Sequence, residues 1–479
     1  MFVLLIGLAC DEGSADKLAD SAEAVGADSG DSGATDDSGL GDSGGGGDDG
    51  GDTGTLPIAE VDVTAEISAY VNTVAIVRWT TTVATAGRVE FGLTTAYGHV
   101  SNTTPAATEH EVLLLGMTAD TEVHFRVVID AETGEQATKD YTITTLSLPS
   151  GMPVPVVSGA VTGQWAYQVT PIQGSAPIVT ILDSAGKVIW YYKPTTEGNL
   201  MKVVLTHDRK SVLLGHAGPQ GDLESSKLEW ISLDGGTVTT VTVPGFDHDL
   251  IELPDGTVAM IVVEDRTLDD GSIWSADRIV ERAPDGTETV VFNAWDQLDP
   301  TGLGLEEFAN WTHGNGIEYT VADDCYYLSM KEPGSLAKIP RETGVPEWIV
   351  NGMFNQFTFL DGAESGAMQH QFEVLGDGHL LLFDNGQPER GYSRAVELQL
   401  DETTMEAIQL WEYVRVPPVY VYAKGDVHRF ADNSTQITWS TAGEMQLVDE
   451  AGGLLWQLNL PLGAATTFVH PVQSLYEDR

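Results

Sequence analysis

Basic residues and cysteines are scarce in this sequence. Lysine and arginine together number 23 against 72 aspartates and glutamates, so the formal net charge is −49. A chain this acidic repels the phosphates of nucleic acids, which excludes nucleic-acid binding as its function. The two cysteines are Cys10 and Cys325. Cys325 lies beside the apolar run YYLSM, so we expect a buried, inert thiol there.

The apolar segment at the beginning of the chain is short. MFVLLIGLAC has nine mostly apolar residues before its cysteine, whereas a membrane-spanning helix needs about 20. Its end, GLAC, resembles a bacterial lipobox, in which the cysteine is lipidated and becomes the mature N-terminus. The basic residues that open a signal peptide are missing, so we expect the true start to lie upstream. We therefore predict a lipoprotein-type signal segment over residues 1–9 and lipidation of Cys10, with a plain secretory signal as the alternative; both predict export.

Apolar residues are also scarce between residues 10 and 55. Thirteen acidic residues and a single lysine are spread there among glycine, serine and alanine. Such a segment has too little apolar surface to form a core. We expect residues 10–56 to be a disordered tether.

Residues 57–148 show short alternating strands separated by turn signals. The segments VAIVRWTTTV, GRVEFG, HEVLLLGM, EVHFRVVID and KDYTITTL lack helical periodicity, which favours a small β-sandwich. RVEFGLTTAYG and LLGMTADTEVHFRVVI resemble a fibronectin type III domain. We assign no chemistry to this domain.

A repeat of about fifty residues runs through residues 149–479. An apolar strand, an acidic residue, a small turn and a second strand recur six times, at intervals of 50, 50, 58, 60 and 49 residues; the turn centres are Gly186, Gly236, Gly286, Gly344, Thr404 and Gly453. A second hairpin, such as QFEVLGDGHLLLF, lies between copies. Two hairpins per repeat give four strands, the unit of a β-propeller. The fold class predicted is all-β, with a six-bladed propeller behind the small sandwich and the tether.

Three histidines stand where inner strands begin in three consecutive blades. They are His248 in FDHDLIEL, His313 in NWTHGNGIEY and His370 in MQHQFEVL. Because inner strands line the central channel of a propeller, we expect these imidazoles to converge at its mouth. Two kinds of site fit them: a three-histidine zinc site, and an anion site in which one ring is a nucleophile. The residues alone leave both open.

The segments DHDLIELPDG, NWTHGNGIEY, LSMKEPGSLAKI, MQHQFEVLGDGHLLLFDNG and YSRAVELQLDETTMEAIQLWEY, in this order, resemble the bacterial arylsulfotransferases. The resemblance covers most of residues 150–479. It implies an exported enzyme that passes a sulfuryl group from a phenolic sulfate ester to an active-site histidine and then to a phenol. It also implies that no cofactor, nucleotide sulfate donor or metal takes part.

The resemblance assigns roles residue by residue. His370 matches the nucleophile, and His248 and His313 match the histidines that bind sulfuryl oxygens and assist proton transfer. Asn315 matches an asparagine of the site, while Lys331 stands where the family has its catalytic arginine. Arg394 is a candidate to compensate for that arginine, with a blade-surface ion pair as its alternative role. Trp311, next to His313, is a candidate to hold the aryl ring, with blade packing as its alternative.

The function expected is therefore an exported aryl-sulfate sulfotransferase that works through sulfo-His370. The alternative is a non-catalytic propeller that binds an anionic or aromatic ligand. The partners expected are an aryl sulfate donor, a phenolic acceptor, a bacterial membrane through the lipid on Cys10, and a second copy of the chain in a homodimer. The location expected is the cell envelope, periplasmic or at the cell surface.

Overall fold

The computed structural model describes residues 61–131, 134–174, 177–195, 198–219, 222–305, 308, 310–360 and 368–477. Strands dominate them; the helical elements in these ranges are α1 (Ala294–Gln297) and two 3-10 turns (Leu223–Ser225 and Ser440–Ala442). The all-β prediction is confirmed. The described residues all belong to one compact unit. The predicted signal segment and tether, residues 1–56, lie outside the described residues.

The first seven strands form one connected sheet of their own. They are β1 (Val61–Ile67), β2 (Ala75–Gly92), β3 (His99–Val100), β4 (Thr104–Leu114), β5 (Glu122–Ala131), β6 (Gly134–Ala137) and β7 (Tyr141–Thr144). Side chains alternate between the two faces of a strand, and the long β2 accordingly buries Trp79, Val89 and Phe91 in one core with Phe125 of β5. The domain boundary near residue 148 and the resemblance to fibronectin type III stay predictions.

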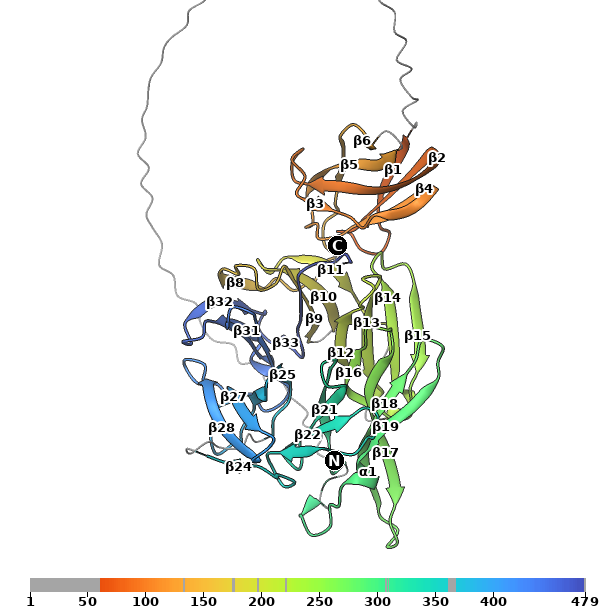
Figure 1. Cartoon of the computed structure of the whole chain (residues 1–479). Coiled ribbons are helices and arrows are strands. Elements are labelled where there is room, and N and C mark those ends of the chain that lie inside the picture. The colour runs from red at the N-terminus through yellow and green to blue at the C-terminus, as the bar shows by residue number, and fades with distance from the viewer. Residues whose placement is uncertain are drawn as a thin grey trace, which may run out of the picture. The chain divides into compact units, whose positions relative to one another are not determined.

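Six further sheets form the six blades of a propeller, which confirms the fold predicted from the repeats (Figure 1). Blade 1 contains β9 (Tyr167–Gln173), β10 (Ile178–Asp183) and β11 (Val188–Tyr192). Blade 2 contains β12 (Asn199–Leu205), β13 (Ser211–Ala217), β14 (Lys227–Ser232) and β15 (Val238–Thr242). Blade 3 contains β16 (Phe246–Glu252), β17 (Val258–Thr267), β18 (Ile273–Arg282) and β19 (Glu288–Asn293). Blade 4 contains β20 (Gly314–Thr320), β21 (Cys325–Met330), β22 (Ser335–Pro340) and β23 (Trp348–Val350). Blade 5 contains β25 (Phe372–Gly376), β26 (His379–Asp384), β27 (Arg394–Asp401) and β28 (Glu406–Tyr413). Blade 6 contains β29 (Asp426–Arg429), β30 (Thr435–Trp439), β31 (Glu444–Val448) and β32 (Leu454–Asn459). A short strand, β24 (Thr358–Phe359), pairs with β28 at the outer edge of blade 5.

Strands from both ends of the propeller segment close the ring. β8 (Val156–Gly159) pairs with β32 at the outer edge of blade 6, while β33 (Ala465–Thr466) and β34 (His470–Val472) pair with β9 and give blade 1 its inner strand. Each end of the segment therefore completes a sheet begun by the other. Radial closure of this kind leaves only short, protected strand edges.

Apolar clusters lie between neighbouring blades. One cluster joins Ile261 and Ile279 of blade 3 to Leu328 and Ile339 of blade 4. Similar clusters join blades 4 and 5 and blades 5 and 6. Each sheet thus buries its faces against its neighbours, and the polar groups of the inner strands are left for the channel.

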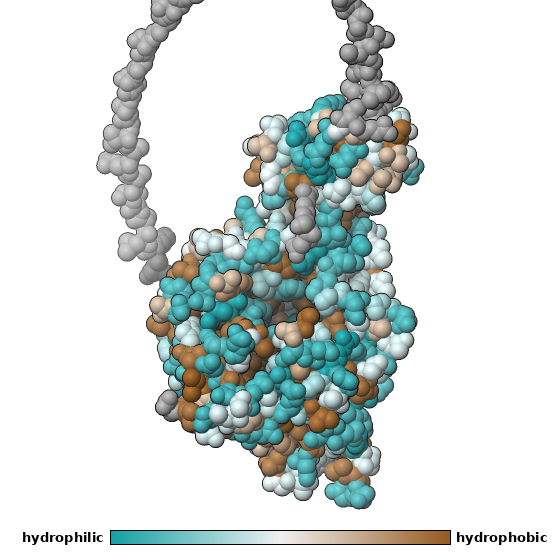
Figure 2. Space-filling model, viewed as in Figure 1, coloured by the Kyte–Doolittle hydropathy of each residue, from teal (hydrophilic) through white to brown (hydrophobic). Residues whose placement is uncertain are grey.

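The face shown in Figure 2 is mainly polar. Figure 2 shows hydrophilic residues over much of the visible face, with hydrophobic residues scattered among them. Within the described ranges, no helix is both long and apolar enough to cross a bilayer.

Candidate active site

The three histidines occupy the mouth end of the inner strands of blades 3, 4 and 5. His248 is the third residue of β16, His313 directly precedes β20, and His370 stands two residues before β25. His248 and His313 have left-handed backbones, with φ of 61° and 46°. Ladder irregularities follow at both sites, between Phe246 and Leu250 and between Gly314 and Gly316. Local departures of this kind re-aim side chains and are frequent at functional sites.

His248 and His313 form a directly bonded pair of imidazoles. Their Nε2 atoms lie 3.2 Å apart, and their ring centroids 4.8 Å apart. The Nδ1 atom of His248 lies 3.0 Å from the Asp247 carboxylate, and that of His313 lies 3.0 Å from Glu332. Two imidazoles in such contact need one proton between their Nε2 atoms.

The two rings differ in proton affinity. Burial opposes a charge on His248, but the carboxylates of Asp247, Asp277 and Asp249 together outweigh it and raise the pKa of this ring. Burial lowers the pKa of His313, and the charges of His248 and Lys331 lower it further, despite the hydrogen bond with Glu332. His248 is therefore the protonated ring and donates from Nε2 to Nε2 of neutral His313. The pair can give up a proton and take it back.

Lys331 lies at this pair. Its ammonium contacts Oε1 of Glu332 at 2.7 Å, the same oxygen that meets His313, and its backbone N–H donates to the His313 carbonyl at 3.1 Å. Burial favours a protonated Glu332, but its hydrogen bonds and ion pairs with His313 and Lys331 hold the pKa of its carboxyl below the ordinary value. The charged Glu332 thus fixes both basic groups in position.

His370 is buried and differs from the other two in its partner. Its Nδ1 lies 2.8 Å from Oδ1 of Asn385, whose Nδ2 donates at 2.8 Å to the carbonyls of Val421 and Lys424. These two bonds fix which end of the amide faces the ring, so His370 Nδ1 must carry the hydrogen. The lone pair of His370 is consequently on Nε2.

His370 is held neutral as well as oriented. Burial lowers its pKa to about 3; the hydrogen bond to Asn385 acts in the opposite direction, and the neighbouring basic groups His248, His313 and Lys331 lower the pKa further. A buried imidazole with a free Nε2 lone pair has the state that a nucleophile requires. These effects show that His370 shares its electrostatic environment with the other three groups.

Asn315 braces the segment beside His370. It is fully buried, and its Nδ2 donates to the carbonyl of Gln369 at 2.8 Å. The Gln371 side chain donates to the Asn315 carbonyl at 3.2 Å and to Asp249 at 2.8 Å. Blades 3, 4 and 5 are thereby connected through residues that flank the histidines.

Two buried aspartates, Asp277 and Asp249, hold the segments next to the histidines in place. Asp277 accepts hydrogen bonds from the Thr312 hydroxyl and the Gly314 N–H, both at 2.5 Å, and so holds the residues on either side of His313. Asp249 pairs with Lys202 at 2.9 Å and accepts the Ile317 N–H at 3.0 Å. Sequence reasoning missed both. The only signal for Asp249 was its place directly after His248.

Two residues predicted at the site, Trp311 and Arg394, have contacts that favour their alternative roles. Trp311 is fully buried, with ring centroids 5.7 Å from Trp295 and 6.3 Å from Phe354. This burial and these ring contacts favour the packing alternative over the predicted role in holding an aryl ring. Arg394 on β27 pairs with Asp384 at 2.8 Å and with Glu412 at 2.9 Å. These contacts favour its ion-pair role, and its part in compensating for the family arginine stays a prediction.

The described residues bear on two other kinds of chemistry, metal binding and thiol reactivity. Among them, no group of three or more His, Cys, Asp and Glu side chains is arranged to hold a metal ion. Of the three imidazoles, His248 and His313 are in direct contact. Cys325 is buried and unpaired, and burial raises the pKa of its thiol to about 11. Cys10 lies outside the described residues.

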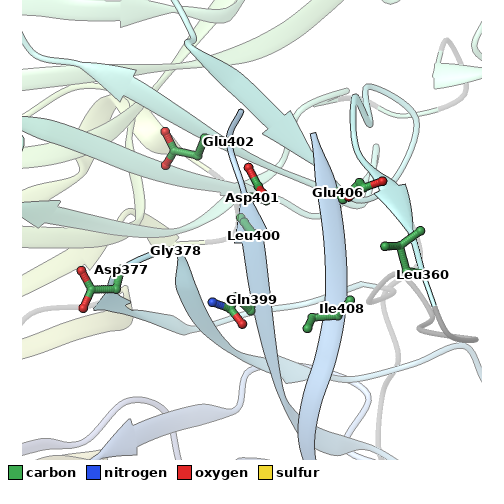
Figure 3. Close-up of a pocket in the computed structure, with 9 residues that line it drawn as sticks. All are labelled: Leu360, Asp377, Gly378, Gln399, Leu400, Asp401, Glu402, Glu406 and Ile408. Atoms are coloured by element: carbon green, nitrogen blue, oxygen red, sulfur yellow. The ribbon is translucent and has the colours of Figure 1, made fainter. Parts of the chain in front are cut away.

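A sizeable cavity lies at the other end of β25, away from His370. It has a volume of about 510 Å³. Residues of the β25–β26 turn and of strands β27 and β28 line it (Figure 3). Its lining carries four carboxylates, from Asp377, Asp401, Glu402 and Glu406. Such a lining repels a sulfate ester, so this cavity is not suited to an anionic ligand.

Comparisons with known proteins show the family of the chain. The sequence model of the family described as Arylsulfotransferase (ASST) matches residues 166–448, more than half of the chain. The chain is similar to the arylsulfate sulfotransferase AssT of Escherichia coli O6:H1, with 24% identity over 50% of this chain and 53% of that protein. It is also similar to AssT of Lelliottia amnigena, with 28% identity over 24% of each chain. The chain thus spans about half the length of the first relative and a quarter of the second.

Solved structures resemble the chain more weakly. A protein of unknown function from Bacteroides caccae matches with a TM-score of 0.40 and 12% identity, over 64% of this chain and all of that one. Virginiamycin B lyase from Staphylococcus aureus matches with a TM-score of 0.32 and 14% identity, over 64% of this chain and all of that one. Scores this low carry no argument about activity.

Proposed function

The chain belongs to the arylsulfotransferase family, and from this premise we propose that it transfers a sulfuryl group from an aryl sulfate to a phenol. One observation carries the proposal. A neutral histidine whose Nε2 bears a lone pair, His370, lies in the electrostatic field of a histidine pair that holds a proton. A transfer through a covalent intermediate needs a nucleophile and a proton donor side by side.

In the first step, Nε2 of His370 attacks the sulfur of the aryl sulfate. The new N–S bond forms as the S–O bond to the aryl ring breaks, and the leaving phenolate takes a proton from the His248–His313 pair. Lys331 and the protonated His248 stabilise the charge that develops on the sulfuryl oxygens.

In the second step, an acceptor phenol replaces the departed one. Its hydroxyl proton passes to the His248–His313 pair, its oxygen attacks the sulfur, and the N–S bond breaks. The electron pair returns to Nε2 of His370, so the site ends in the state in which it began. No external base is needed, because the pair receives in this step the proton that it gave in the first.

Trapping the intermediate tests this mechanism. The protein is mixed with 4-nitrophenyl sulfate without acceptor, quenched in base and digested, and the peptide that contains His370 is examined by mass spectrometry. We expect an added SO₃ group on His370 that disappears when phenol is supplied before quenching. Release of nitrophenol in the presence of phenol, with no modified peptide, would contradict the covalent mechanism.

One observation favours the alternative of a binding propeller without turnover. Glu332 partly neutralises Lys331, the residue that stands in place of the family arginine. The same assay separates the two functions. A protein that binds aryl sulfates without releasing nitrophenol is a binding module.

We also propose that the chain is attached to the bacterial cell envelope by a lipid on Cys10, which rests on the GLAC segment. Metabolic labelling with a radioactive fatty acid should mark the full chain and leave Cys10→Ala unlabelled. A parent protein that stays unlabelled would contradict the anchor. A homodimer is proposed on the sequence alone, and sedimentation of the purified protein tests it.

A further inference from the structure

A lysine takes the place of the histidine in the next blade. Lys424 stands two residues before β29, the inner strand of blade 6, as His370 stands two residues before β25 in blade 5. Its backbone is left-handed, with φ of 63°, like those of His248 and His313. Four consecutive blades therefore present a nitrogen base at the mouth end of the inner strand.

The backbone of Lys424 is fixed to the proposed nucleophile through one side chain. Asn385 donates from Nδ2 to the Lys424 carbonyl at 2.8 Å, and its Oδ1 meets His370 Nδ1 at 2.8 Å. The N–H of Gln371 also donates to the carbonyl of Gly425 at 3.4 Å. Lys424 is thus positioned by the group that orients His370.

The charge of Lys424 is uncompensated. Lys424 is half-buried, and its ammonium donates to the side-chain oxygen of Gln173 at 2.7 Å, a neutral partner. Within the described ranges, no ion pair joins it to a carboxylate, whereas Lys331 has Glu332 and Lys202 has Asp249. Burial lowers the pKa of Lys424 to about 8, which leaves most of its charge at neutral pH.

A buried cation without a counter-ion is unfavourable unless an anion completes the site. Carboxylates are plentiful in this chain of net charge −49, yet within the described ranges none forms an ion pair with Lys424. We propose that Lys424 is a further substrate-binding residue, whose ammonium holds a sulfuryl oxygen of the aryl sulfate. The inference rests on the proposed function and adds a residue of blade 6 to the site.

Substitution at Lys424 tests the inference. The ligand is 4-nitrobenzenesulfonate, which has the charge and shape of the donor but cannot transfer its sulfur group, and its binding is measured by calorimetry. We expect Lys424→Met to weaken this binding and to raise the KM for 4-nitrophenyl sulfate by at least about tenfold, because one charged hydrogen bond is lost. Lys424→Arg should stay within about threefold of the parent, since it keeps the charge.

A matched control removes the same charge elsewhere. Lys210 is 74% exposed in the turn between β12 and β13, and Lys210→Met should leave sulfonate binding unchanged. Sulfonate affinity within twofold of the parent in a folded Lys424→Met protein would overturn the inference. Sulfonate binding that depends on Lys424 in a protein without turnover would keep the inference and refute the transfer function.

A measurement on the unmodified chain covers the case in which Lys424→Met does not fold. The protein is acetylated with and without saturating 4-nitrobenzenesulfonate, and modification of each lysine is compared by mass spectrometry. We expect the sulfonate to protect Lys424 and not Lys210. Equal acetylation of Lys424 in both samples, or no sulfonate binding at all, would overturn the inference.

Discussion

Two histidines of the channel, His370 and His428, have opposite proton affinities. Burial lowers the pKa of His370 to about 3. Burial opposes a charge on His428 too, but Asp426 and then Glu373 outweigh it and raise the pKa to about 9. The difference lies in the bonded partner, since the His370 ring meets the neutral amide of Asn385 and the His428 ring meets the Asp426 carboxylate at 3.2 Å. Neutral and charged histidines are thus made in one channel by the choice of amide or carboxylate.

The mouth and the deeper part of the channel also differ in the titratable groups that their inner strands present. At the mouth, the inner strands present His248, His313 and His370. Farther along the same strands, they present Glu318 and Glu373, and burial together with Glu373 raises the pKa of Glu318 to about 8. The mouth is therefore suited to an anion, while the deeper part is stabilised by a protonated His428 and a protonated Glu318 at neutral pH.

The largest effect should come from removing the neutral histidine. We expect His370→Ala to lower transfer from 4-nitrophenyl sulfate to phenol by at least about 10⁴-fold, because the covalent route is lost. The matched variant in the deeper channel, His428→Gln, should keep transfer within a few-fold of the parent when assayed well below its melting temperature. Near-parent turnover in His370→Ala would show that His370 is not the nucleophile.

The partner of His370 is the next target. Asn385→Asp replaces the amide by the kind of group that His428 has, so the pKa of His370 should rise and its Nε2 should be protonated near neutrality. We expect transfer at pH 7 to fall by about 100-fold and to recover as the pH rises through the new pKa, since the neutral ring is the active form.

A pH–rate profile of the Asn385→Asp variant checks this effect. Asn385→Ser is the control, because it also loses the bonds to Val421 and Lys424 but adds no charge. A loss of rate in Asn385→Asp that does not recover with pH would mean that Asn385 matters through these backbone bonds alone.

The repeats carried enough information to predict the fold. Each blade has an Asp-Gly or similar turn between apolar strands, so hairpins and their spacing can be read locally. The three histidines were found because each precedes or enters an inner strand in a recognisable hairpin. Lys424 occupies the corresponding place, but its strand β29 has only four residues and follows a long loop, which obscured the correspondence.

Contacts between strands could not be predicted. Asn385 lies fifteen residues from His370 across a hairpin, and Arg394 meets Asp384 and Glu412 only when three strands pair. Trp311 is close to His313 in sequence, yet its ring turns into the core between blades 3 and 4. Proximity in sequence identifies the strand but not the face on which a side chain lies.

The deeper part of the channel should affect stability and not transfer. Glu318 holds its proton up to about pH 8 in the folded protein but would release it near 4.5 when unfolded. The folded state therefore binds more protons in this window, and its stability falls as the pH rises from 4.5 to 8. We expect Glu318→Gln, which has no charge to bury, to melt about 2–4 °C above the parent at pH 9 and close to it at pH 5.

Thermal unfolding at the two pH values checks this prediction. Glu109→Gln removes the same charge from an exposed position of β4 and should show no such pH dependence. An equal rise for Glu318→Gln at pH 5 would mean that charge burial is not the cause.

The smallest effect should come from Lys331, the mouth residue that stands in place of the family arginine. The guanidinium of Lys331→Arg can bind Glu332 with one edge and a sulfuryl oxygen with the other, whereas the ammonium already contacts Glu332 at 2.7 Å. We expect kcat to rise about two- to fivefold with little change in KM, because the second contact strengthens as charge develops in the transition state. Lys331→Met should lower kcat, while the donor KM should respond more strongly to Lys424→Met. Steady-state kinetics of these variants checks the prediction. If kcat is unchanged in both Lys331 variants, the Lys331 ammonium serves only to fix Glu332. The charge on the sulfuryl oxygens is then stabilised by His248 and Lys424.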